Sequence, residues 1–226
     1  MRHKIIVLAI EGYAASARKD EDTLSASVEK VFNWKILKGM IEEGHCHITE
    51  MNSFKYSCVK NIAANLMVSI ALSQAYDKID VVCIGKSMGA AKLLHGINKY
   101  IKHCLKDPRK AAQLAKVNSF NLMFIDPHGK PRQEWFSFKP TYGKRRDLEI
   151  PHHWWKVLPN LSISNYYQQE EYPEGAKVIG ANPVVKLTDC DHWNITEHKE
   201  VIKGLKDIRW RITQSITNTL PLKVFS

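Results

Sequence analysis

The sequence predicts an α/β fold with a mostly parallel central sheet and helices on both of its faces. Short, continuous apolar runs, typical of strands buried on both sides, alternate along the chain with longer amphipathic segments typical of helices. A helix between two strands returns the chain to the same end of the sheet, so this alternation favours parallel neighbours. The length of 226 residues suits one such domain, and we assign residues 1–226 to it.

The first third of the chain predicts two strands and two helices. Residues 4–10 are apolar and rich in β-branched side chains, which indicates a central strand. Residues 23–43 carry apolar side chains on one helical face, and residues 45–51 alternate as a strand does. Residues 57–76 predict a second amphipathic helix, with the core side chains Val59, Ile62, Ala63, Leu66, Ile70 and Leu72.

The middle of the chain repeats the pattern of strand, helix and strand. Residues 79–84 form a β-branched apolar run and predict a fully buried strand. Residues 90–105 have helical periodicity, and residues 107–110 (Asp-Pro-Arg-Lys) are expected to break that helix. Residues 117–125 predict the next strand.

The last third begins with a segment of different composition, residues 129–159, which we expect to be a cap or lid inserted beside the site. It has four prolines and no sustained period, and its aromatic side chains could contact an apolar substrate group or simply pack the insert on the domain. Residues 161–168 and 183–188 predict two further strands. Residues 195–216 predict a closing helix, with the core side chains Val201, Ile202, Leu205, Ile208, Trp210 and Ile212.

A five-residue turn, Gly85-Lys86-Ser87-Met88-Gly89, joins the strand at 79–84 to the helix at 90–105. Glycine two positions to either side of the serine lets so sharp a turn avoid the neighbouring strand and helix. The Ser87 hydroxyl is therefore expected at the mouth of the sheet. The backbone N–H of Met88, in the first helical turn, is expected to face an oxyanion formed at that serine.

This G-x-S-x-G turn resembles the nucleophile elbow of the α/β-hydrolase superfamily, whose members carry nucleophile, acid and histidine in that order along the chain. The resemblance implies that Ser87 is the nucleophile. It also implies that His192 is the base, because His192 lies between the last strand and the last helix in Asp-His-Trp-Asn-Ile. In this family the loop after the first central strand supplies a second oxyanion N–H, which here falls near Gly12 or Tyr13.

The acid has two candidate positions. Asp126 ends the strand at 117–125 and is followed by Pro127, a setting similar to that of the acid in pancreatic-type lipases. Most members of the superfamily carry the acid one strand later, where this chain has Glu170 and Glu171. We favour Asp126, because an adjacent strand end could bring its carboxylate to the ring of His192.

A triad of Ser87, His192 and Asp126 implies two-step acyl transfer and predicts hydrolysis of a carboxylic ester, as in esterases and lipases, with a small molecule or lipid ester as substrate. No metal and no organic cofactor is expected. A thioesterase or an acyltransferase would use the same triad. The alternative from another class is a binding protein on a hydrolase scaffold that has no activity.

Composition bounds the partners and the compartment. The formal charge of +10 favours weak attraction to anionic surfaces, but only Lys144-Arg145-Arg146 is a compact basic run and no nucleic-acid motif accompanies it, so no specific nucleic-acid partner is expected. Five scattered cysteines without a C-x-x-C pair predict reduced thiols. The apolar run near the N-terminus is too short for a signal peptide, and together these features favour a cytoplasmic protein.

Overall fold

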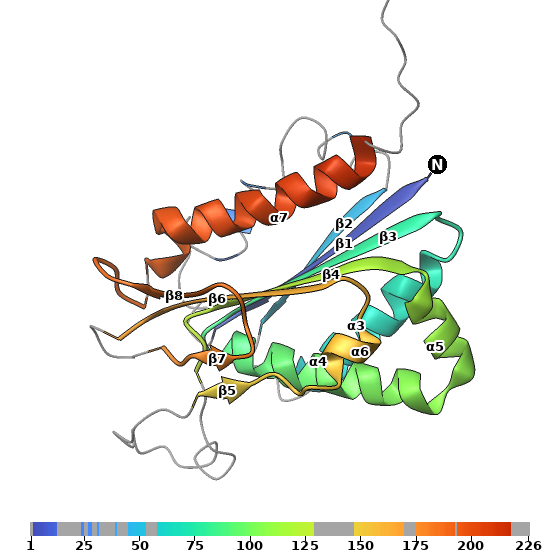
Figure 1. Cartoon of the computed structure of the whole chain (residues 1–226), viewed down its shortest axis with the longest axis horizontal. Helices are drawn as coiled ribbons and strands as arrows, with labels where there is room; N and C mark the ends of the chain where they lie inside the picture. Colours follow the sequence, from blue (N-terminus) through green and yellow to red (C-terminus); the bar gives the residue numbers. More distant parts are fainter. Residues whose placement is uncertain are drawn as a thin grey trace, which may run out of the picture.

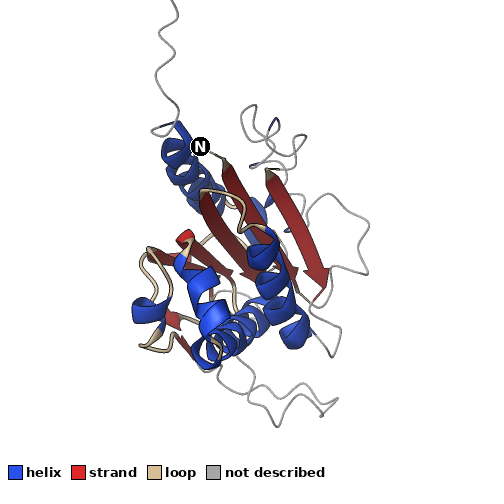
Figure 2. Cartoon of the chain, turned by 90° about the vertical axis from the view of Figure 1, so that its right-hand side faces the viewer, coloured by secondary structure: helices blue, strands red, loops and turns tan. Residues whose placement is uncertain are grey.

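The computed structural model describes residues 2–12, 24, 27–28, 31, 39, 45–52, 58–128, 147–169, 175–192 and 194–217. Within these residues a six-stranded sheet forms the centre of the molecule, in the order β2-β1-β3-β4-β6-β8, and each pair of neighbours is parallel. Figure 2 shows its strands side by side. The strands are β1 (His3–Glu11), β2 (Cys46–Asn52), β3 (Lys78–Lys86), β4 (Val117–Ile125), β6 (Leu161–Gln168) and β8 (Val184–Leu187).

Helices cover both faces of the sheet (Figure 1). Side chains alternate along each strand, so that Val81 and Cys83 of β3 join one apolar cluster while Val82 and Ile84 join the other. The first cluster packs under α3 (Cys58–Leu72), α4 (Met88–Lys106), α5 (Pro108–Ala115) and α6 (Trp154–Val157). The second packs under α7 (Lys199–Thr217) together with Leu24, Val28 and Val31. The molecule is therefore of the α/β class, as its sequence predicts. None of the helices in the described ranges has the length and hydrophobicity needed to cross a bilayer.

The expected break of the helix at 90–105 is confirmed, because α4 ends at Lys106 and Asp107 is extended, and a further helix starts at this break. α5 begins at Pro108, directly after α4, and the side chain of Asp107 caps it by accepting a hydrogen bond of 3.0 Å from the N–H of Arg109. Aspartate at the N-cap and proline at the first helical position are standard start signals. The sequence prediction did not include α5, because the same residues that end one helix can begin the next.

Two core assignments within the predicted helices are wrong. Trp210 is 62% exposed and Leu72 is 78% exposed. The buried stripe of α7 consists of Val201, Leu205, Ile208 and Ile212, and position 210 falls outside it. Leu72 is the last residue of α3, where the covering neighbours end. The closing helix is also divided, because the short 3-10 turn Ile195–Glu197 precedes α7 and the backbone of His198 between them is extended.

The part of the expected cap segment that the structure describes, residues 147–159, packs on the domain. Trp154 of α6 is fully buried in the first apolar cluster with Ile150 and Leu158. The short strand β5 (Leu148–Glu149) pairs in parallel with β7 (Val178–Ile179). Residues 129–146, with the aromatics Trp135, Phe136, Phe138 and Tyr142, lie outside the described residues, and the lid stays a prediction.

A buried polar network crosses the amino end of the sheet. Asp80 of β3 is fully buried, and its Oδ2 lies 2.6 Å from Nε2 of His3 on β1. Its Oδ1 accepts hydrogen bonds from Asn118 Nδ2 at 2.9 Å and from the Ser119 hydroxyl at 2.5 Å. Burial alone would raise the pKa of Asp80, but the hydrogen bonds from His3, Ser119 and Asn118 outweigh it and hold the pKa below its ordinary value.

We expect Asp80→Ala to lower the free energy of unfolding at pH 7 by about 3 kcal/mol, because it leaves the donors of a buried network without their acceptor. The lowered pKa means that the contribution of the Asp80 carboxylate is complete above the ordinary carboxyl range and is lost as the pH falls through the folded-state value. Urea unfolding of the native protein and of Asp80→Ala should therefore show a difference in the free energy of unfolding that becomes smaller at low pH. Asp77→Ala, at an exposed carboxylate three residues away, is the control. An equal loss of unfolding free energy in the control would contradict this account, and so would a difference between native protein and Asp80→Ala that grows at low pH.

Candidate active site

Ser87 occupies the turn between β3 and α4 with φ 54° and ψ −127°, a backbone conformation that side-chain-bearing residues rarely adopt. The two glycines of the motif make this turn possible. A Cβ at Gly85 would lie 2.7 Å from Cα of Ala90, and a Cβ at Gly89 would lie 2.4 Å from the carbonyl oxygen of Ile10. The motif thus forms a tight, strained turn from strand to helix. The Ser87 residue on this turn is 7% exposed.

The two expected sources of oxyanion N–H groups flank the serine. Met88 is the first residue of α4, where backbone N–H groups have no acceptor within the helix. Gly12 follows β1, and a Cβ placed on it would lie 3.0 Å from Cβ of Ser87. The backbone at Gly12 therefore lies against the serine side chain. Tyr13 lies outside the described residues.

Asp126 and His192 are hydrogen-bonded to each other, Oδ2 of the carboxylate to Nδ1 of the ring. Asp126 is fully buried and His192 is 5% exposed. Gln168, the last residue of β6, donates its backbone N–H to Asp126 Oδ1 at 3.1 Å and its side-chain amide to Oδ2 at 3.4 Å. Asp126 itself turns out of β4 at φ 43° and donates its N–H to the carbonyl of Tyr166. The structure thus brings together the two residues that the sequence paired.

Gly175 completes the surroundings of the Asp126 carboxylate. A Cβ on Gly175 would lie only 1.7 Å from Asp126 Oδ1, so no other residue fits beside the carboxylate without moving it. Sequence reasoning missed both Gly175 and Gln168. The position of Gln168 at the end of a predicted strand was a usable signal, whereas nothing in the local pattern distinguishes Gly175 from other loop glycines.

The carboxylate of Asp191, the residue before His192, takes part in a local turn. Asp191 closes a local turn with Asn194, in which each residue's side-chain oxygen accepts the backbone N–H of the other. Glu170 and Glu171 lie outside the described residues. Among the residues that the structure describes, no group of three or more His, Cys, Asp or Glu side chains is placed to hold a metal ion.

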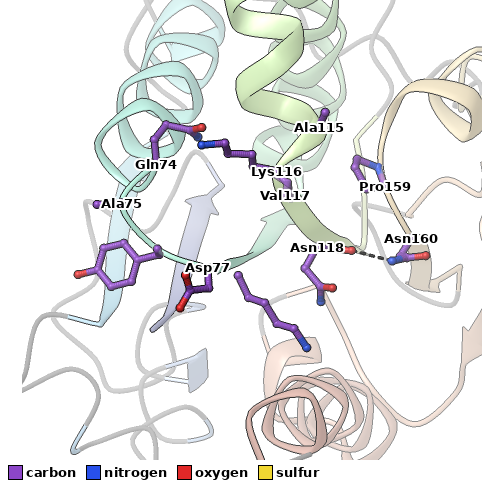
Figure 3. Close-up of a pocket in the computed structure, with 11 residues that line it drawn as sticks. Gln74, Ala75, Asp77, Ala115, Lys116, Val117, Asn118, Pro159 and Asn160 are labelled. Atoms are coloured by element: carbon purple, nitrogen blue, oxygen red, sulfur yellow. Dashed lines mark hydrogen bonds between the residues drawn. The ribbon is translucent and has the colours of Figure 1, made fainter. Parts of the chain in front are cut away.

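A hollow of about 620 Å³ lies at the opposite end of the sheet (Figure 3). Its walls are the loops that lead into β3, β4 and β6, and its lining includes Lys78, Lys116 and Asn160. The amide of Asn160 already donates to the carbonyl of Asn118, and that of Gln74 donates to the carbonyl of Ile70. The amides that line this hollow are therefore engaged within the protein, and the hollow includes none of the Ser87, Asp126 and His192 side chains.

Comparison with solved structures gives a weak likeness. No family model matches the chain, and no curated protein matches it either. Among solved structures, lipase B of Aspergillus fumigatus is similar with a TM-score of 0.36 and 12% identity. The match covers 82% of this chain and 44% of the lipase chain, so this chain spans less than half the length of that protein. The description of the site therefore rests on this chain's own geometry.

We expect Gly175→Ala to break the hydrogen bond between Asp126 and His192, because the added methyl group and Asp126 Oδ1 cannot occupy the same space. The ring N–H that donates to a buried carboxylate should give a low-field proton NMR signal in the native protein, and this signal should disappear in the variant. Gly39→Ala is the matched control, since a Cβ at Gly39 meets nothing within 4 Å. A folded Gly175→Ala variant that keeps the signal would show that the close approach is not needed.

Proposed function

We propose that this protein is a serine hydrolase of the carboxylesterase or lipase type, acting on a carboxylic ester through a Ser87–His192–Asp126 triad. The observation that carries the proposal is the hydrogen bond between a fully buried Asp126 carboxylate and His192, at the same sheet edge as a serine on a strained elbow. A buried carboxylate bonded to Nδ1 leaves Nε2 as the ring nitrogen that can exchange a proton with a serine. The scaffold alone would not carry this conclusion, because one fold supports many functions.

The reaction proceeds in two steps. In the first, His192 takes the hydroxyl proton as Ser87 Oγ attacks the acyl carbonyl, and the oxyanion accepts hydrogen bonds from the N–H of Met88 and the backbone near Gly12. The proton passes from His192 to the departing alkoxide, which leaves as an alcohol, and the acyl group remains on Ser87. In the second, His192 takes a proton from water, the hydroxide attacks the acyl-enzyme, and Ser87 regains its proton as the acid departs.

The electrostatics of Asp126 suit its role in this mechanism. The carboxylate keeps His192 in the tautomer with hydrogen on Nδ1, and its negative charge stabilises the imidazolium that forms transiently. Gln168 supplies two further donors to the same carboxylate, so that the charge is compensated although it is buried. These hydrogen bonds also hold the Asp126 side chain in place throughout the reaction.

The two cysteines within the described strands, Cys46 of β2 and Cys83 of β3, do not offer a rival nucleophile. Cys83 of β3 is fully buried, and burial raises the pKa of its thiol. Burial likewise raises the pKa of Cys46 to about 12. Because the thiolate is the reactive form of cysteine, both side chains remain inert thiols at neutral pH.

We expect Ser87→Ala to lose hydrolysis of short p-nitrophenyl esters by about 10⁴-fold or more, because the acyl acceptor is removed. The variant should also fail to react with a fluorophosphonate probe that labels the native protein. Ser69→Ala, at a serine of α3, is the matched control and should keep both properties. Normal turnover by a folded Ser87→Ala protein would rule out Ser87 as the nucleophile.

We expect Asp126→Asn to keep the fold and lose most of the rate, by up to about 10⁴-fold, because an amide favours the wrong tautomer of His192. The kcat of each variant with the same ester measures this. Glu170→Gln and Glu171→Gln, at the alternative acid positions, should have almost no effect. A large loss in either glutamate variant, with activity retained in Asp126→Asn, would reassign the acid.

A further inference from the structure

The outward side of α7 carries a row of exposed side chains that neither the core nor the candidate site uses. Lys199, Lys203, Lys206 and Trp210 are all exposed, and Trp210 is exposed to 62%. At 3.6 residues per turn these four positions lie within about 60° of one another around the helix, and they extend over roughly 16 Å of its length. We call them the outer stripe of α7. It lies opposite the buried stripe of the same helix and therefore faces away from the sheet.

The outer stripe belongs to a positively charged helix. α7 has five basic and two acidic side chains, which gives it a net charge of +3. Among the residues that the structure describes, none forms an ion pair with Lys199, Lys203 or Lys206. The positive charge of the stripe is therefore presented to whatever lies outside the molecule.

Trp210 gives the stripe an apolar component. In the part of α7 whose side chains the structure describes, it is the only large apolar side chain that is exposed. A protein partner is usually held by a cluster of apolar anchors within a polar rim, and one ring beside three lysines does not form such a cluster. An indole ring has an apolar body and a polar N–H, and it suits the boundary between lipid headgroups and acyl chains.

We propose that the outer stripe of α7 docks this protein on an anionic lipid surface. The three lysines lie against the negatively charged headgroups, and the ring of Trp210 enters the layer at headgroup level. Attraction between basic side chains and anionic lipids, together with burial of apolar area, is what holds a helix in the plane of a bilayer surface. This role goes beyond the proposed function and does not depend on it, because the stripe includes no member of the triad.

The position of α7 is compatible with a working site at the same time. The helix lies across one face of the sheet, with α3, α4, α5 and α6 on the other (Figure 1). Ser87, Asp126 and His192 lie instead at the carboxyl edge of the sheet, and α7 begins seven residues after His192. Docking through the outer stripe covers the face of the sheet that α7 occupies and leaves this edge at the side of the molecule.

The test measures binding of the full chain to vesicles by sedimentation. The native protein should bind phosphatidylcholine vesicles that contain about one quarter phosphatidylserine, should not bind phosphatidylcholine alone, and should dissociate as salt is added. Replacing Lys199, Lys203 and Lys206 together by glutamine should lower the partition coefficient on the order of a hundredfold, about fivefold for each lysine. Glutamine is as good a helix former as lysine, so the fold should be kept.

A matched control separates the stripe from the net charge of the chain. Replacing Lys60, Lys102 and Lys106 together by glutamine removes the same three charges from exposed positions of α3 and α4 on the other face of the sheet. This variant should bind the phosphatidylserine vesicles almost as the native protein does. An equal loss in the two triple variants would show that only total charge matters, and would overturn the assignment to α7.

A second variant tests the indole ring. Trp210→Ala should lower the partition coefficient about tenfold, because the apolar area that the ring buries in the layer is lost. Lipids brominated near the headgroup should quench part of the tryptophan fluorescence of the native protein, and this part should be missing in Trp210→Ala. Trp155→Ala, at a tryptophan of α6 that is 44% exposed, is the control and should change neither result.

The remaining outcomes decide the partner and separate this proposal from the proposed function. Failure of the native protein to bind the phosphatidylserine vesicles at low salt overturns the proposal. Binding to duplex DNA as tight as to the vesicles, lost in the α7 triple variant but kept in Trp210→Ala, replaces the lipid surface by a nucleic acid. Ser87→Ala should bind vesicles as the native protein does, so a failure of ester hydrolysis leaves the docking surface standing.

Discussion

The carboxyl edge of the sheet depends on one constraint, the need to compensate the fully buried carboxylate of Asp126. A charge removed from water is tolerated only where donors surround it. Here the donors come from Gln168 at the end of β6 and from His192 after β8, while Gly175 leaves the space. Because β4, β6 and β8 are adjacent in the sheet, their ends deliver these groups to one place. The order of the strands in the sheet thus determines which groups meet at the Asp126 carboxylate.

Because the site depends on which strands are neighbours, the sequence could predict some of its features and not others. The bounds of β4 and β6 were predicted to the residue, β6 from the alternation of its side chains. The pairing of Asp126 with His192 followed from the resemblance in the order of motifs. The contacts of Gln168 and Gly175 with Asp126 were not foreseen, because they arise from which strand ends are neighbours. That information lies in contacts between segments 40 or more residues apart, and no local periodicity records it.

The two ends of the sheet use buried polar groups in different ways. At the amino end, Asp80 is surrounded by three donors on regular strands, which is an arrangement for stability. At the carboxyl end the backbone itself departs from favoured conformations, with positive φ at Ser87, Asp126 and Asp189. Each such residue costs on the order of 1–3 kcal/mol and persists only where the surroundings enforce it. Three of the four non-glycine residues with positive φ in the described part of the chain therefore lie at the carboxyl end, and the fourth, Asn160, precedes β6 at the amino end.

The backbone hydrogen bonds that hold these conformations also tie Ser87 to the corner of the chain that carries Asp126. The N–H of Ser87 donates to the carbonyl of Ile125, and its carbonyl accepts the N–H of His128. Both backbone groups of the serine are thus bound by the single corner of the chain that carries Asp126. A movement of the elbow would have to carry this corner with it. Asp126 is therefore coupled to Ser87 through two backbone hydrogen bonds that flank it in the chain, at Ile125 and at His128. If the two residues act as acid and nucleophile, as proposed, this direct coupling holds them at the edge of one sheet.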